Sequence, residues 1–341
     1  MVSESKSEEG RRVRLDRSIK VRADSIYAVS SLKEITFLLG PRLALVLLLL
    51  ALPLVLPNIY WQKVLCIFGV YALLAIGFDF LANFAGLVCL GGAFFVGVGG
   101  YISGILNSSF DLSPFLTIPI GTVGGAVICT LALLPCLSLR GPYFAIVSFV
   151  YPLILERLIA STRIFGGTEG ISGLATPTGI WSVQYLIIGI VLICMFGLRR
   201  LVNQDVGLVF RGVKENDQGI RASGLNVTYY RAVAVFITAL MGCFAGAYLS
   251  HLYGWVGMSL FAVDFSILPL AATVVGGPGT LVGPVLGALL LVPISEALRS
   301  FGTLRIVFYS TCLVLFIVFF SQGLLNYFSR KYGQFEHWVK V

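Results

Sequence analysis

The feature that most constrains this 341-residue chain is its series of long apolar runs that are almost free of charge. Several of these runs approach or exceed the roughly 20 residues that a helix needs to cross the hydrocarbon core of a bilayer. The runs are continuously apolar and do not alternate at every second residue, which is typical of membrane helices and not of barrel strands. The sequence therefore predicts an all-α polytopic membrane protein.

The apolar runs predict about ten transmembrane helices, some of them broken. They lie near residues 43–57, 62–83, 85–106, 114–138, 142–160, 182–198, 232–253, 260–276, 281–298 and 303–328. Glycine and proline interrupt the runs at 85–106 and 260–298, where regular helix is least expected. This membrane domain, 43–328, is flanked by a basic tail at 1–42, whose residues 25–39 fit an interfacial amphipathic helix, and by a tail at 329–341.

The distribution of basic residues predicts the orientation of the chain. Of the 24 lysines and arginines, nine lie in the tail 1–42, six in the loop 199–231 and three in the tail 329–341. Cytoplasmic loops carry the excess of such residues, so both termini and the loop 199–231 are predicted to be cytoplasmic, in a cell inner membrane. The same rule explains the net charge of +8, which therefore does not indicate nucleic-acid binding.

The residue patterns of several chemistries are absent from the sequence. There is no G-x-x-x-x-G-K-[ST] motif, so we do not expect this chain to hydrolyse ATP. The chain has two histidines, His251 and His337, and seven cysteines scattered singly through apolar runs, which argues against a metal site or a disulfide framework. We expect no catalytic residue, no metal and no cofactor on this chain.

Charged residues within the predicted spans are few. Asp79 lies well inside its span and is the best candidate for a functional interior carboxylate, although a structural hydrogen-bonding role fits it equally well. The others are Glu156, Arg157, Asp264 and Glu296. An ion-coupled carrier usually needs such groups along its path, so a stand-alone secondary transporter driven by an ion gradient is the weaker alternative. A membrane scaffold or receptor has no positive feature in the sequence.

A polar segment, "RGVKENDQGIRASGLNV" at residues 211–227, interrupts the apolar pattern and carries five charged residues in seventeen. Val209, Val213 and Ile220 have the spacing of one face of a short helix, which two glycines weaken. On the cytoplasmic surface this element is suited either to docking a soluble partner or to lying as a linker against anionic lipid. Two glycine-rich segments, 91–104 and 274–290, similarly fit either broken helices near a substrate path or close helix packing.

The polar segment resembles the cytoplasmic coupling loop of the branched-chain amino acid permeases of ABC importers, whose pattern is close to R-A-I-R-E-N-E-x-x-A-x-x-L-G-I-N-V-x-x-Y. The matching residues are Arg211, Val213, Lys214, Glu215, Asn216, Asp217, Gly224, Leu225, Asn226, Val227 and Tyr230. The similarity continues in "FAGLVCLGGAFFVGVGGYISG", "FGGTEGISGL" and "VVGGPGTLVGPVLGALLL". It covers roughly residues 62–328 in order and leaves the tail 1–42 uncovered.

This resemblance implies a type II-like ABC importer permease that forms half of a pore for branched-chain amino acids or a similar small polar solute such as urea. It also implies the partners: a second permease, homologous or identical, two cytoplasmic subunits that bind ATP, and an extracytoplasmic solute-binding protein. The implied ATPase-coupling residues are Arg211, Lys214, Glu215, Asn216, Asp217, Gly224 and Asn226. The candidate pathway or gate residues are Asp79, Gly91, Gly92, Gly97, Gly166, Gly167, Leu268, Gly276 and Gly277.

Three positions depart from the family pattern. Gly92 stands where members often carry histidine or glutamine, Leu268 where they often carry glutamate, and Arg221 where an acidic residue is expected. Because the first two lie in segments expected to border the pathway, the resemblance leaves the identity of the solute open.

Overall fold

The computed structural model describes residues 45–54, 58–139, 141–162, 166–177 and 179–298, and five positions beyond them (311, 314 and 323–325). The chain divides into two units, Met1–Leu49 and Leu50–Val341, and the architecture below is that of the second unit. The tails predicted at 1–42 and 329–341, the interfacial helix at 25–39 and nearly all of the span near 303–328 lie outside the described residues.

Seven helices within the described residues are long and apolar enough to cross a membrane. They are α3 (Ile59–Asp79) with its extension η1 (Phe80–Phe84), α4 (Gly92–Phe110), α5 (Pro114–Leu133) with η2 (Leu134–Ser138), α6 (Pro142–Thr162), α7 (Ile180–Val202), α10 (Val227–Tyr253), and η4 (Met258–Phe261) with α11 (Asp264–Gly276). Two shorter apolar helices, Leu45–Leu54 and α12 (Gly283–Ala297), fall on further predicted spans. The all-α polytopic class is confirmed, and the number of ten spans stays a prediction.

Helix α10 lies at the centre of the second unit, where it packs against α3, α4 and α5. Small residues permit the close approach of α10 and α4. A Cβ added at Gly246 would collide with the Val96 backbone, and one added at Gly99 would collide with the Cys243 backbone. The glycines of segment 91–104 therefore serve close helix packing, as in many membrane proteins.

The peripheral helices α5 and α6 expose apolar side chains. Phe115 on α5 is 76% exposed and Ile146 on α6 is 61% exposed. Such a surface would be costly in water but is suited to lipid or to another apolar subunit.

The chain does not form one regular helix at 85–106, where the sequence indicated an interruption, and the span there begins at Gly92. η1 is a π-helical turn in which the Ala85 N–H donates to the Phe80 carbonyl. Residues 85–91 then run without helix, with Gly86 at φ +73°, and α4 begins at Gly92. The span near 260–276 is likewise divided, into the 3₁₀ turn η4 and α11.

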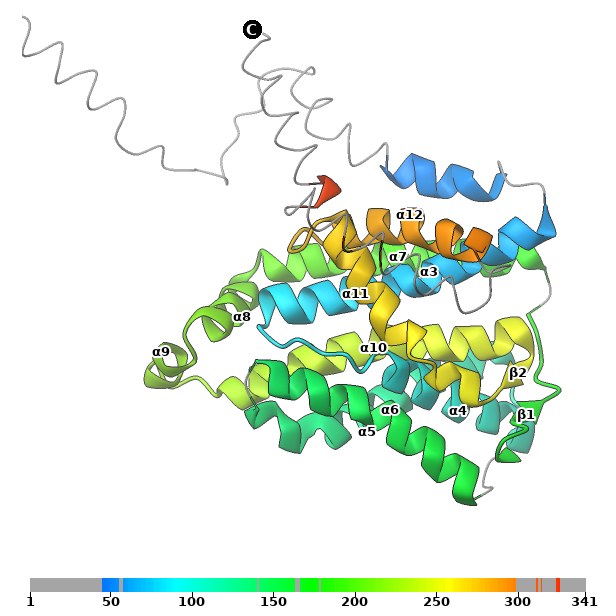
Figure 1. Cartoon of the computed structure of the whole chain (residues 1–341), viewed down its shortest axis with the longest axis horizontal. Helices are drawn as coiled ribbons and strands as arrows, with labels where there is room; N and C mark the ends of the chain where they lie inside the picture. The colour runs from blue at the N-terminus through cyan, green and yellow to red at the C-terminus, as the bar shows by residue number, and fades with distance from the viewer. Residues whose placement is uncertain are drawn as a thin grey trace, which may run out of the picture. The chain divides into compact units, whose positions relative to one another are not determined.

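Short elements lie at the two ends of α10, as Figure 1 shows. At one end, β1 (Ile171–Ser172) pairs antiparallel with β2 (Trp255–Val256). At the other end, two short helices, α8 (Asp205–Glu215) and α9 (Asp217–Ala222), connect α7 to α10. A helix of 27 residues spans about 40 Å at 1.5 Å per residue, which is the thickness of a bilayer with its headgroup regions.

Candidate functional site

The polar segment between α7 and α10 forms the two helices α8 and α9, where the sequence indicated a single short helix. The break falls at Asn216, whose backbone is extended (φ −147°, ψ 90°). The Asn216 side-chain oxygen accepts a hydrogen bond from the Gly219 N–H at 3.0 Å and so caps the N-terminus of α9. The break follows from this capping residue and needs no external partner.

Helix α8 is anchored by its apolar face. Phe210 is fully buried and meets Phe80 of η1 edge to face at 5.5 Å, and it meets Tyr230 of α10 in the same way at 6.1 Å. Val213 is buried beside it. These contacts fix α8 against both η1 and the first turns of α10, because edge-to-face aromatic pairs add directional contact to area burial.

Two basic residues of α8 also contact η1. The Lys214 ammonium donates to the Asn83 carbonyl oxygen at 2.8 Å. The Arg211 guanidinium lies over the Phe84 ring, 5.8 Å from its centre. The basic residues that the resemblance assigned to ATPase coupling therefore bind the membrane helices of their own chain.

Asp217 is the most enclosed charged residue of α9. Its Oδ1 accepts from Arg231 Nη2 at 3.2 Å, and its Oδ2 lies 3.8 Å from Arg221. Arg231 also donates from Nη1 to the Leu137 carbonyl at 3.1 Å, which ties α9 and α10 to η2. Removing one partner of such an enclosed ion pair costs several times more than an exposed pair is worth.

Gly224 and Asn226 shape the turn from α9 into α10. Gly224 adopts a positive φ of 83°, which only glycine adopts readily. The Asn226 side-chain oxygen accepts from the Tyr229 N–H at 3.3 Å and caps α10. Six of the seven predicted coupling residues thus have a structural role that the structure itself explains, and the seventh, Glu215, is exposed.

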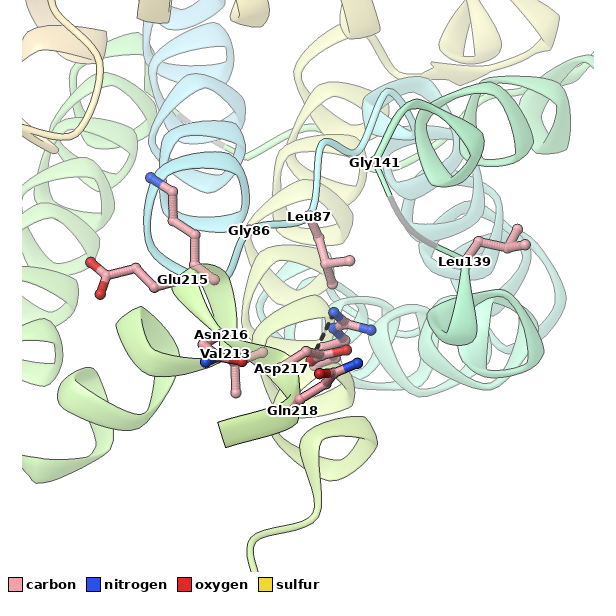
Figure 2. A pocket seen from close by; sticks show the side chains of 11 residues that line it. Gly86, Leu87, Leu139, Gly141, Val213, Glu215, Asn216, Asp217 and Gln218 are labelled. Atoms are coloured by element: carbon pink, nitrogen blue, oxygen red, sulfur yellow. Dashed lines mark hydrogen bonds and ion pairs between the residues drawn. The ribbon is translucent and has the colours of Figure 1, made fainter. Parts of the chain in front are cut away.

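A cavity of about 330 Å³ opens between α8–α9 and the neighbouring loops. Figure 2 shows its lining, with the Glu215 carboxylate turned away from Asp217. The lining residues are Gly86, Leu87, Leu139, Gly141, Val213, Lys214, Glu215, Asn216, Asp217, Gln218 and Arg231. The cavity is a recess of mixed charge on the α8–α9 surface, of a size that admits one or two side chains of another protein.

The α8–α9 surface is connected to the loop between α11 and α12 through Asp79. The Asp79 carboxylate is fully buried and accepts from Asn83 Nδ2 at 2.7 Å, from the Gly279 N–H at 2.7 Å and from the Leu281 N–H at 3.0 Å. Leu281 has a φ of +59°, a conformation that non-glycine residues adopt rarely. Lys214, Asn83 and Asp79 therefore form one hydrogen-bonded chain from α8 to that loop, and a pathway role for Asp79 stays a prediction.

The other candidate pathway residues do not converge on one site. Gly92 packs on the backbone of Phe265, Gly97 on the ring of Phe261, and Gly276 on the backbone of Gly283. The remaining glycines lie beside these contacts or in the turn before β1: Gly91, Gly277, Gly166 and Gly167. Leu268 differs from them, because it lines a second cavity at the β1–β2 end of α10.

The loop that follows β1 is held by a buried histidine that sequence reasoning did not assign to a site. His251 Nδ1 lies 2.8 Å from the Ala175 carbonyl, which can only accept, so Nδ1 carries the proton. The Nε2 atom then accepts from the hydroxyls of Ser103 at 3.0 Å and Thr117 at 2.8 Å. Asn107 adds a bond from the Ala175 N–H at 2.9 Å. Four segments meet at this cluster, whose members are too far apart in sequence for spacing to reveal.

Two further groups were missed by the sequence analysis. Asn83 lies four residues after Asp79, a spacing that places the two side chains on one helical face and so was a readable signal. Asp264 and Glu296 were noted as charges within spans, but nothing in their sequence position indicated that they line one cavity.

The apolar helices, the polar α8–α9 element at one end and the strand pair at the other define a multi-pass α-helical membrane protein. The model of the family described as "Branched-chain amino acid transport system / permease component" matches residues 60–321, and the chain belongs to this family. It is therefore a transport protein of the inner membrane and a member of a class of subunits that assemble into multi-subunit transporters.

Named relatives agree with this assignment. The high-affinity branched-chain amino acid transport system permease proteins LivM of Salmonella typhimurium and Escherichia coli are each 28% identical to the chain over 287 residues, which cover 75% of this chain and 68% of the relative. A probable branched-chain amino acid transport permease protein LivM of Methanocaldococcus jannaschii is 25% identical over 215 residues, covering 59% of this chain and 62% of the relative. No solved structure is significantly similar to the chain.

Proposed function

We propose that this chain is the permease subunit of an ATP-driven ABC importer and forms half of a pore for branched-chain amino acids. The observation that carries the proposal is the α8–α9 element, a preformed polar surface bound to the η1 end of α3 through Lys214 and Phe210 and to α10 through Asp217. The relatives' names favour branched-chain amino acids over urea as the solute.

The α8–α9 surface is the proposed dock for one of two ATP-binding subunits. ATP binds and is hydrolysed on those partners, in agreement with the missing phosphate-binding motif in this chain. Movement of α8 passes to the loop between α11 and α12 through Lys214, Asn83 and Asp79. Allosteric coupling requires such a contiguous physical connection, and here each of its bonds is a specific one.

The remaining partners and the orientation follow from the same proposal. The α8–α9 end and both termini face the cytoplasm, as the positive charge of the segment 199–231 favours. The β1–β2 end then faces the extracytoplasmic solute-binding protein. A second permease, identical or homologous, covers part of the apolar surface on the peripheral helices.

Glu215→Lys tests the dock. Glu215 is exposed, and the hydrogen bonds and ring contacts described above for α8–α9 do not involve its side chain. A change at Asp217, in contrast, would break the Arg231 pair and disturb folding as well. Charge reversal at an interface typically weakens binding by roughly tenfold or more. We expect the variant to lose its ATP-binding subunits on co-purification and to lose ATP-dependent L-leucine uptake into proteoliposomes.

Glu169→Lys is the matched control, because Glu169 is also exposed but lies beside β1 at the other end. It should leave the ATP-binding subunits bound. Wild-type uptake that continues without those subunits and follows an imposed ion gradient would establish the secondary transporter instead. Normal assembly and uptake of Glu215→Lys would place the dock elsewhere.

A further inference from the structure

A second cavity lies at the β1–β2 end of α10, away from the α8–α9 surface. Its volume is about 440 Å³, and α3, α10, η4, α11 and α12 all contribute to its wall. Cavities of about 300–1,000 Å³ with a few converging polar groups are typical of small-molecule sites. The charged residues in the lining are two carboxylates, Asp264 and Glu296.

The fold places these two carboxylates at the same end of the cavity. α11 and α12 form an antiparallel hairpin whose close approach is made by Gly287 against the backbone of Ala272. Asp264 is the first residue of α11, and Glu296 is the last but one of α12. In an antiparallel hairpin the start of one helix lies beside the end of the other, so the two acids stand opposite each other.

The next turn of the same helices is aliphatic. Leu268 follows Asp264 by four residues, and Val292 precedes Glu296 by four, so each shares a helical face with its acid. Both lie about 6 Å further towards the α11–α12 loop at 1.5 Å per residue. Leu249 lines the same cavity from α10. The cavity thus has an acidic end and an aliphatic end.

Aromatic residues complete the acidic end. Phe265 adjoins Asp264 and stacks on Tyr71 of α3, with ring centres 5.4 Å apart and planes inclined by 21°. The Tyr60 hydroxyl donates to Glu296 Oε1 at 2.9 Å, which positions that carboxylate. Trp255 lies in the wall as well. Aromatic faces and carboxylates both attract cations.

We propose that this cavity binds a small solute with a positively charged amino group and an aliphatic body. The ammonium group lies between Asp264 and Glu296, and the aliphatic body lies against Leu268, Val292 and Leu249. The inference rests on the proposed function and deepens it, because it names the chemistry by which the permease selects its solute. A neutral amide such as urea has neither feature.

Binding to the purified full-length chain in lipid nanodiscs tests this proposal without ATP or partners. The fluorescence of Trp255 is the signal, and Trp255→Phe identifies its share of the emission. We expect saturable changes with L-leucine and with isoamylamine, which keeps the ammonium and the branched chain but has no carboxylate. Isocaproate, which keeps the branched chain and a carboxylate but has no amino group, should produce no change. Equal responses to isocaproate and isoamylamine would overturn the proposal.

Two sets of variants separate charge from size. The double variant Asp264→Asn and Glu296→Gln should weaken isoamylamine binding by roughly tenfold or more, since charge-assisted hydrogen bonds are lost. Leu268→Phe should weaken isoamylamine but leave methylamine unaffected, because it fills the aliphatic end alone. A misfolded protein would lose both amines together, so this size dependence keeps the test decisive. Unchanged affinities in both sets would refute the site.

Uptake by the reconstituted transporter distinguishes this inference from the proposed function. Amine binding at the cavity without ATP-dependent uptake would contradict the function and retain the site. ATP-dependent uptake whose KM for L-leucine is unchanged in the double variant would retain the function and refute the site.

Discussion

Single polar side chains hold together parts of this protein that are far apart in sequence. Asp79 bonds to backbone N–H groups 200 and 202 residues later in the chain. His251 joins two neighbouring helices and the loop after β1 in the same way. In a membrane interior, where few alternative partners exist, a polar group without a hydrogen-bond partner is costly. Both carboxylate oxygens of Asp79 and both ring nitrogens of His251 have such partners.

Asp79→Asn tests the role of that carboxylate. The amide keeps one acceptor but turns an NH₂ group towards backbone donors, so at least one buried donor is left without an acceptor, at a cost of about 1–3 kcal/mol. We expect a lower apparent Tm for the purified chain in detergent. Asp205→Asn, at the exposed start of α8, is the control and should leave Tm unchanged. An unchanged Tm in Asp79→Asn would show that the loop is held by other contacts.

At the scale of elements, packing depends on which glycines face a backbone and which face open space. In α10, Gly246 lies against the Val96 backbone, whereas Gly189 in α7 has nothing within 4 Å of an added Cβ. The two residues look alike in the sequence, since each is a glycine in a long apolar run. The difference arises from the neighbouring helix.

Gly246→Ala and Gly189→Ala therefore form a matched pair. The first should destabilise the protein by about 1–3 kcal/mol through overpacking of α10 against α4. The second should be neutral or stabilise α7 by up to about 1 kcal/mol, because alanine is the better helix former. Thermal unfolding with size-exclusion chromatography of the detergent-extracted chain measures both. Similar behaviour of the two variants would show that α4 and α10 adjust freely.

At the scale of the whole described unit, the α8–α9 surface and the second cavity lie at opposite ends of one long helix, α10. The α8–α9 surface is linked to the α11–α12 loop, and α11 and α12 form part of the wall of the second cavity. An event at the first region can thus bias the second through helices that both regions share.

Lys214→Met tests this link. It removes the ammonium that bonds the Asn83 carbonyl but retains the length of the side chain. We expect the ATP-binding subunits to remain bound, while L-leucine transported per ATP hydrolysed decreases several-fold in proteoliposomes. Lys63→Met, an exposed lysine in the first turns of α3, is the control. If Lys214→Met loses assembly and transport in parallel, Lys214 belongs to the dock and not to the link.

The apolar runs were enough to predict the class of fold, because bilayer thickness sets a length that a helix must meet. The glycines of the run at 85–106 indicated an interruption but not its place at 85–91, because those residues are as apolar as a helix and the π-helical turn η1 is not visible in the sequence. The polar segment was assigned through its motif, but the motif does not distinguish Asn216, a helix cap, from Glu215, an exposed side chain. That distinction depends on backbone conformation.

The second cavity could not be predicted from the sequence, for a related reason. Its wall draws on six elements between Ile67 and Glu296, and the four α-helices among them each contribute side chains four residues apart that look like ordinary helix faces. Of the predicted pathway residues, Leu268 lines this cavity, and the sequence had singled it out as a departure from the family pattern. Only the antiparallel pairing of α11 and α12 brings Asp264 and Glu296 together.

The π-helical turn η1 sets the rotation of residues 80–84 about the helix axis, and so the direction in which the Asn83 side chain points. An α-helix advances about 100° per residue, so loss of one residue between Phe80 and Asn83 would swing the Asn83 amide away from Asp79. The bilayer fixes the rotation of α3 through its apolar faces and leaves no freedom to compensate. Length in this short stretch is therefore under stricter control than composition, and insertions or deletions here should be far more harmful than substitutions.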